Sequence, residues 1–177
     1  MKRLILTFLS ALIFSSASYA SDVLEFNVTG SIGVATCDVK NADQTHDLGL
    51  WLVSDTANVK PGATWTSTAV PYTLDFDCPA GQKIALQLSG NQYDAGNEFY
   101  IGLDKTDDTA EGIVVVMHYF AEDSRWISVV YNRAVVPISM TVAGTNTIKL
   151  RSFYRTIGQA VKPGTANATV TVNVSYQ

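Results

Sequence analysis

The chain has 177 residues, with 12 lysines and arginines, 16 aspartates and glutamates, and a formal net charge of −4. This length suits one domain with an adequate core, and no repeat, linker or low-complexity tract indicates a second domain. An acidic chain without basic clusters argues against binding to nucleic acid or to anionic lipid.

The first twenty residues have the pattern of a secretory signal peptide. A short basic start, Met1-Lys2-Arg3, precedes an apolar run over 4–14, and Ser18-Tyr19-Ala20 offers small residues at the two positions that a signal peptidase reads. The apolar run is too short to span a bilayer, so we expect cleavage rather than an anchor. The mature chain then begins at Ser21 with 157 residues and a net charge of −6, because the signal holds two cations and no acid.

A strand-like alternation begins directly after the expected cleavage site. Over 22–34, one face of an extended strand is apolar apart from glycine, and the other face is mainly polar. Such a segment is either an ordinary first strand of a sandwich or an arm that pairs with another molecule, and periodicity alone leaves both open. The residues of the apolar face are Leu24, Phe26, Val28, Gly30 and Ile32.

The chain contains two cysteines, Cys37 and Cys78. An exported protein meets oxidising conditions, so one disulfide between them is the economical interpretation. Two cysteines without a supporting histidine cluster make a poor zinc site. Since both sulfurs are committed to the disulfide, neither is expected to act as a thiol nucleophile.

The body of the chain consists of short β-branched and aromatic runs that recur about every ten residues, with no convincing helical stripe. This pattern predicts an all-β sandwich. Polar connectors that contain glycine and aspartate separate some of the runs, at 90–97 and 104–111. The expected strands are 46–53, 71–78, 83–89, 99–103, 112–120, 125–131 and 146–154.

Seven aromatic residues gather between positions 93 and 131. Most of them are expected in the core, because aromatic side chains dominate core area. A minority would form an exposed contact patch for glycan or protein, and the sequence does not separate the two groups. The seven are Tyr93, Phe99, Tyr100, Tyr119, Phe120, Trp126 and Tyr131.

The sequence shows no catalytic constellation. The two histidines, His46 and His118, lie in separate expected strands, and no nucleophile elbow, zinc-protease, phosphate-loop or dinucleotide motif occurs. The acidic residues between 104 and 111 lack the alternate ligand spacing and mid-loop glycine of an EF-hand, so a solvated loop is expected there. We therefore expect no enzyme, no metal and no cofactor.

The last fourteen residues, 164–177, alternate strictly between an apolar and a polar face, which is the strongest strand signal that a sequence offers. No later segment covers the free edge of this strand. It is therefore expected either to be locked into a complete sheet or to serve as a docking edge. Its apolar face consists of Ala166, Ala168, Val170, Val172, Val174 and Tyr176.

Taken together, these segments resemble the subunits of chaperone–usher pili, the type 1-like bacterial fimbriae. The matching pieces span nearly the whole mature chain, and their order makes the set fairly specific. They are Gly30 seven residues before Cys37, Asp47-Leu48-Gly49, Val70-Pro71-Tyr72-Thr73-Leu74 leading into Cys78, Asn146-Thr147-Ile148-Lys149-Leu150, Gly164 fourteenth from the end, and the penultimate Tyr176.

The resemblance implies an incomplete immunoglobulin-like sandwich that lacks its final strand. In such pilins a hydrophobic groove stays open beside the C-terminal strand, a periplasmic chaperone inserts a strand there, and at the outer-membrane usher the next subunit's N-terminal arm replaces it. The chain would divide into a signal peptide (1–20), a donor-strand arm (21–34) and a pilin domain (35–177). The chaperone-recognised edge would comprise Gly164, Val170, Val172, Val174 and Tyr176.

The implied function is that of a structural subunit of a surface fimbria, exported through the periplasm and acting in support of cell adhesion. Its implied partners are neighbouring pilin subunits, the chaperone and the usher, with a host receptor as a further possibility. Cys37 is only the seventeenth mature residue, and this short arm resembles minor or adaptor subunits. The alternative is a self-contained secreted sandwich adhesin that binds host glycan or protein, with the first strand paired inside its own domain.

Overall fold

The computed structural model describes residues 37–52, 69–135, 138–140 and 142–176, all within one compact unit, Val34–Gln177. The expected signal peptide and the expected arm, with Leu24, Phe26, Val28, Gly30 and Ile32, lie outside these residues. The described part of the chain is all-β, which confirms the predicted fold class. None of its segments is a helix long and apolar enough to cross a membrane.

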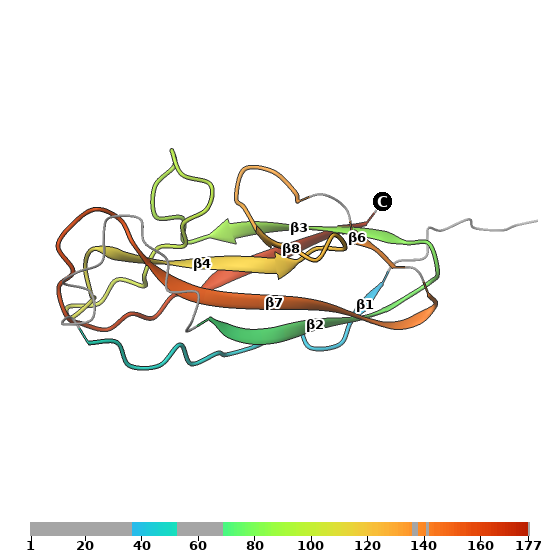
Figure 1. Ribbon diagram of the computed structural model, residues 1–177, viewed down its shortest axis with the longest axis horizontal. Helices are drawn as coiled ribbons and strands as arrows, with labels where there is room; N and C mark the ends of the chain where they lie inside the picture. Colours follow the sequence, from blue (N-terminus) through green and yellow to red (C-terminus); the bar gives the residue numbers. More distant parts are fainter. Residues whose placement is uncertain (1–36, 53–68, 136–137, 141, 177) are drawn as a thin grey trace, which may run out of the picture. The chain divides into compact units, whose positions relative to one another are not determined.

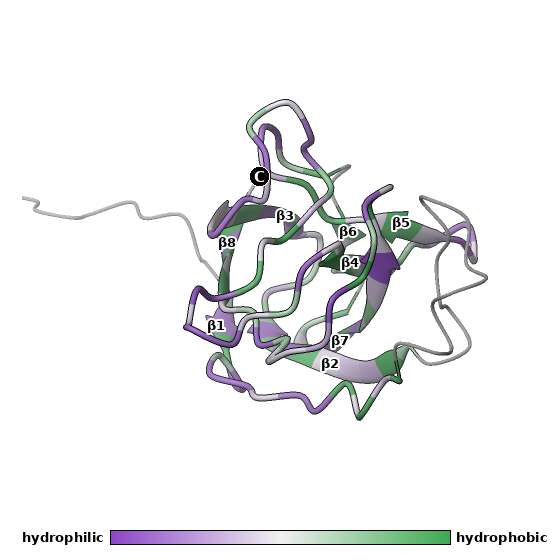
Figure 2. Ribbon diagram, turned by 90° about the vertical axis from the view of Figure 1, so that its left-hand side faces the viewer, coloured by the Kyte–Doolittle hydropathy of each residue, from purple (hydrophilic) through white to green (hydrophobic). Residues whose placement is uncertain are grey.

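Eight strands of the described residues form two antiparallel sheets, which Figures 1 and 2 show from two directions. One sheet has the order β1-β2-β7-β4-β5, and the other has the order β6-β3-β8. The strands are β1 (Asp38–Val39), β2 (Val70–Cys78), β3 (Lys83–Gly90), β4 (Ile113–Phe120), β5 (Trp126–Ser128), β6 (Ile138–Ser139), β7 (Gly144–Thr156) and β8 (Val170–Tyr176).

The core contains the inward faces of both sheets, because alternate residues of each strand point to the same side. In β2, Leu74 and Phe76 are buried while the intervening Asp75 is not. In β3, Ile84 and Leu86 are fully buried. The thirteen-residue β7 pairs with β2 on one side and with β4 on the other, so it is the central strand of the larger sheet.

Two expected strands are not formed. The segment 46–52 has no strand pairing, because the Asp47 carboxylate accepts a hydrogen bond from the Gly49 amide at 2.8 Å and Gly49 turns the chain with φ of +79°. Leu50 is 90% exposed as a result. The segment 99–103 is reduced to isolated bridges at Ile101, with Gln92 on one side and Val115 on the other.

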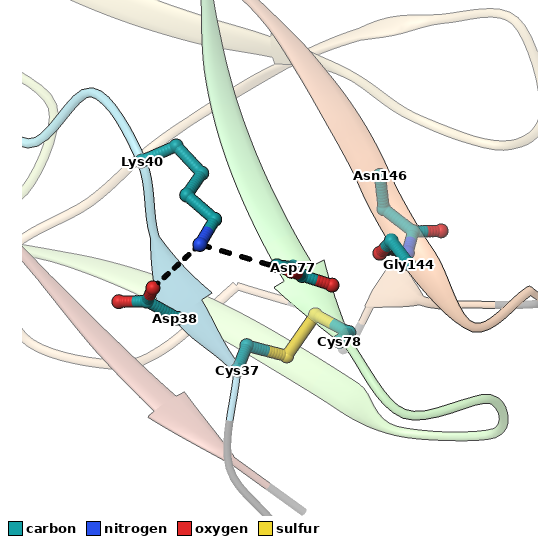
Figure 3. A network of polar contacts seen from close by, with 7 residues as sticks. All are labelled: Cys37, Asp38, Lys40, Asp77, Cys78, Gly144 and Asn146. Atoms are coloured by element: carbon teal, nitrogen blue, oxygen red, sulfur yellow. Dashed lines mark hydrogen bonds and ion pairs between the residues drawn. A yellow bond between two sulfur atoms is a disulfide. The ribbon is translucent and has the colours of Figure 1, made fainter.

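The expected disulfide is present and joins Cys37 to Cys78, with their Cα atoms 4.3 Å apart. It ties the first described residue to the last residue of β2, beside the two-residue pairing of β1 with β2. Figure 3 shows Lys40 next to this link, with its Nζ 2.6 Å from Asp38 Oδ2 and 3.7 Å from Asp77 Oδ2. These ion pairs are exposed and contribute little, so the covalent bond is the main tie.

The segment that leads into β8 is fixed against the acidic loop at 104–111. The Thr165 amide donates to Asp108 O at 2.7 Å, and the Ala110 amide donates to Thr165 O at 2.9 Å. Gly164 touches the same loop backbone so closely that a Cβ there would lie 2.1 Å from Asp108 O. Only glycine fits this contact, and the loop acts as a support for β8.

Loss of the disulfide is expected to destabilise the domain by about 4 kcal/mol, because the 41-residue link would no longer restrict the unfolded chain. The variant is Cys37→Ala with Cys78→Ala, and the measurement is urea unfolding followed by tryptophan fluorescence. Wild type treated with a reducing agent is the control and should shift to the same midpoint. An unchanged midpoint in the double variant would contradict the structural role of the bond.

Gly164→Ala is expected to lower stability by at least about 1–3 kcal/mol, since the added methyl group overlaps backbone that has to move. The matched control is Gly96→Ala, whose Cβ would meet its nearest atom, Asp94 Oδ1, at an ordinary 3.6 Å. Thermal unfolding of both variants measures the difference. Equal midpoints for the two would show that the 164–165 segment does not pack as described.

Candidate functional site

The first candidate site is the free edge of β8. This strand pairs with β3 over its whole length, from Ile84↔Tyr176 to Gly90↔Val170. Among the described residues no strand pairs with its other edge, and Figure 2 shows β8 beside β3 at the end of the smaller sheet. A row of backbone amide and carbonyl groups on such an edge is a template for another strand.

The apolar face of β8 is incompletely covered. Val172 and Val174 pack against the core but are only partly buried, whereas their β3 partners Leu88 and Leu86 are at most 1% exposed. The polar face, with Thr171, Asn173 and Ser175, is exposed. Within the part of the chain that the structure describes, one side of β8 thus presents apolar surface and unpaired backbone together, which suits addition of an extended chain with alternating side chains.

Polar contacts hold both ends of this edge. Before its first residue, the Asp104 carboxylate accepts hydrogen bonds from the Thr169 amide at 3.1 Å and from the Thr169 hydroxyl at 2.8 Å. At its other end, the Tyr176 hydroxyl donates to Cys37 O at 3.1 Å. The edge is therefore presented in a fixed position.

The structure brings four of the five residues expected at the groove edge onto one face of β8. The fifth, Gly164, lies before the strand and contacts the 108–110 backbone instead. The donor-strand residues lie outside the described part of the chain. The four residues on the common face are Val170, Val172, Val174 and Tyr176.

A second candidate surface, which sequence reasoning missed, lies on the outward side of the larger sheet. The guanidinium carbon of Arg151 lies 4.2 Å from the Trp126 ring centroid, a cation–π distance. Trp126 in turn contacts Phe120 with ring centroids 5.1 Å apart, and Lys149 Nζ lies 6.0 Å from the Phe120 ring. We call these four residues with His118 the outer-face cluster.

The positive charge of the outer-face cluster comes from its lysine and arginine. Burial, and then repulsion by Arg151 and Arg155, lowers the pKa of His118 to about 4, so this histidine is neutral at pH 7. A neutral His118 Nδ1 can accept from Arg151 Nη2, which lies 3.4 Å away. In the described ranges no carboxylate pairs with Arg151, Arg155 or Lys149, although five ion pairs occur elsewhere.

The aromatic residues between 93 and 131 divide into three groups. Tyr119 and Tyr131 are buried in the core. Tyr93 and Phe99 are 42% and 39% exposed. The remaining three are partly buried, and two of them belong to the outer-face cluster. These three are Tyr100, Phe120 and Trp126.

The other polar side chains that the sequence singled out as candidate functional residues make structural contacts. His46 stacks on Tyr72 with ring centroids 3.9 Å apart, and burial lowers its pKa. The Asp108 carboxylate accepts from the hydroxyls of Thr165 and Thr106, which lowers its pKa. The part of the chain that the structure describes contains no group of three or more histidine, cysteine and acidic side chains placed to hold a metal ion.

Comparisons of the sequence and of the fold with known proteins point to the same kind of protein. A family model described as fimbrial protein matches residues 26–177. The crystal structure of the P pilus rod subunit PapA is similar in fold, with a TM-score of 0.59 and 19% identity over 80% of this chain and 99% of that one. A subunit from a structure of a chaperone–usher pilus has a TM-score of 0.56 and 18% identity over 92% and 99% of the two chains.

No curated protein sequence matches the chain. At these identities the two structures establish the fold, an immunoglobulin-like pilus-subunit sandwich, and the family match covers most of the chain. This chain therefore belongs to the fimbrial protein family and is a non-enzymatic structural subunit of a bacterial surface pilus, where it contacts other pilin subunits.

Proposed function

We propose that this subunit polymerises by donor-strand complementation, in which the N-terminal arm of a neighbouring subunit adds a strand to the free edge of β8. The observation that carries the proposal is that, within the described ranges, β8 pairs with β3 on one side alone, together with the partly buried Val172 and Val174 on its apolar face. Backbone hydrogen bonds supply affinity in strand addition, and alternate side chains in pockets supply specificity.

The arm has the chemistry that this edge requires. Its apolar residues recur at every second position from 24 to 32, the same period as the apolar face of β8. Burying side chains of the size of Leu24, Phe26, Val28 and Ile32 contributes about 1.5–3 kcal/mol each, or about 6–12 kcal/mol together before ordering costs. This gain would make a subunit-to-subunit link stable.

A subunit that crossed the periplasm with an exposed apolar strand edge would aggregate, because such edges pair with other chains. We therefore propose that the chain crosses the periplasm with a chaperone strand on β8 and exchanges it at the outer-membrane usher for the arm of the next subunit. Each subunit then gives its arm to one neighbour and receives an arm from another. Heterologous contacts of this kind build open filaments.

In this assembly the subunit supports cell adhesion as part of the fimbria. Only sixteen residues separate the expected cleavage site from Cys37, and this short arm favours a minor or adaptor position. The alternative, a self-contained secreted adhesin for host glycan or protein, requires residues 22–34 to pair with β8 of the same molecule.

Phe26→Asp is expected to block incorporation into filaments while leaving chaperone capture intact, because it buries an unpaired charge in the β8 groove of the neighbour. The matched control is Asn27→Asp, which adds the same charge on the opposite face of the arm and should assemble normally. Filament yield and co-purification with the chaperone are the two measurements. Wild-type filament yield from Phe26→Asp would contradict the proposal that residues 22–34 form the donor-strand arm.

Two versions of the mature chain, exported without added chaperone, test whether the domain lacks a strand. One is 21–177 unchanged, and the other carries 22–34 after a flexible linker at its C-terminus instead of at its start. We expect only the second to be a soluble, high-melting monomer, since its arm reaches β8 in the same molecule. An equally stable monomer from the unchanged chain would favour the self-contained adhesin.

A further inference from the structure

We propose that the outer-face cluster is a binding site for an acidic polysaccharide, a chain of sugars that carries carboxylates on its units. The cluster consists of His118, Phe120, Trp126, Lys149 and Arg151, with Arg155 further along the same strand. The proposal uses side chains of β4, β5 and β7 alone, so it stands independently of strand exchange at β8.

The Arg151 guanidinium is set in place before any ligand arrives. It lies over the Trp126 ring at 4.2 Å and 5.7 Å from the centroid of Phe153. Its Nη2 is 3.4 Å from His118 Nδ1, and its Nε is buried without a hydrogen-bond partner. A flat guanidinium held by aromatic rings loses little freedom when it binds a carboxylate through two parallel hydrogen bonds.

Among the described residues, no carboxylate compensates the charge of this surface. Lys149, Arg151 and Arg155 have no carboxylate partner among the described residues, although the whole chain is acidic. The acids on the same side of the sheet are already engaged. Lys40 lies between Asp38 and Asp77, and Asp75 accepts from the Thr147 hydroxyl at 2.7 Å. The same face of a second copy thus offers few free carboxylates, which disfavours a face-to-face contact between two copies.

The shape of the surface favours a polysaccharide over a peptide. Both β4 and β7 are paired on each side, and the edge strand β5 has only three residues, so this face offers little backbone edge to which a peptide could add. It offers aromatic rings against which the apolar C–H faces of sugars pack. The cations lie in a row, since Lys149 and Arg151 are alternate residues about 7 Å apart along an extended strand. A ligand with repeated carboxylates matches such a row.

The test measures binding of a galacturonate hexamer to the exported full chain, in filament or soluble form, by calorimetry. The comparison ligand is the same hexamer with its carboxylates reduced to alcohols. We expect wild type to bind the acidic hexamer at least about tenfold more tightly than the reduced one, as charge-assisted hydrogen bonds require. Added salt should weaken the acidic complex.

Arg151→Gln is expected to weaken binding of the acidic hexamer about tenfold or more. The affinity of Arg151→Lys should lie between those of Arg151→Gln and wild type, because lysine keeps the charge but lacks the planar guanidinium that binds a carboxylate through two hydrogen bonds. Lys149 is exposed, so Lys149→Gln keeps the fold and should weaken binding severalfold. The matched control is Lys83→Gln on β3 of the other sheet, which should bind as wild type.

Three outcomes would overturn the proposal. The first is equal affinity for the acidic and the reduced hexamer, or no binding of either. The second is an equal loss of affinity for the acidic hexamer in Lys83→Gln and Lys149→Gln. The third is self-association of the chain without sugar that disappears in Arg151→Gln. The last result would assign the surface to a contact between copies of the chain.

Discussion

Among the residues that the structure describes, β8 is hydrogen-bonded to a neighbouring strand on one side alone, and the rest of the fold depends on this arrangement. β8 receives its backbone partners from β3, and its inward residues Val172 and Val174 pack on the core but are only partly buried. A soluble sandwich normally protects such an edge with charge, a bulge or a covering segment. Here the polar residues of β8 point outward, and the edge itself stays apolar, which is the arrangement that strand addition needs.

Other parts of the fold keep this edge in position. Gly164 allows the backbone at 108–110 to approach, Asp104 holds Thr169, and the Tyr176 hydroxyl reaches Cys37 O. In the acidic loop, the Asp104 and Asp108 carboxylates accept hydrogen bonds from threonine hydroxyls and a backbone amide, and Glu111 pairs with Lys162. An edge fixed at both ends binds an incoming strand at a lower entropic cost than a mobile one would.

Period-two alternation predicted β2, β3 and β8 well, because each has one apolar face in the core, although Ala85 on the other face of β3 is also buried. It failed at 46–52, where the turn at Asp47 and Gly49 overrides an apolar run. The outer-face cluster was also missed, since Arg151 and Trp126 meet only through strand pairing. A local signal existed in β7, where Lys149, Arg151 and Arg155 alternate with buried residues. The arm stays a prediction.

The disulfide has a mechanical consequence for a filament linked through N-terminal arms. Tension along the filament would enter each domain at Cys37, and without the disulfide it would act first on the two-residue ladder between β1 and β2, which would separate easily. The covalent bond to Cys78 carries the load past that weak point, into a strand joined to β7 over nine residue pairs. The pulling force is then resisted by many hydrogen bonds of the central sheet.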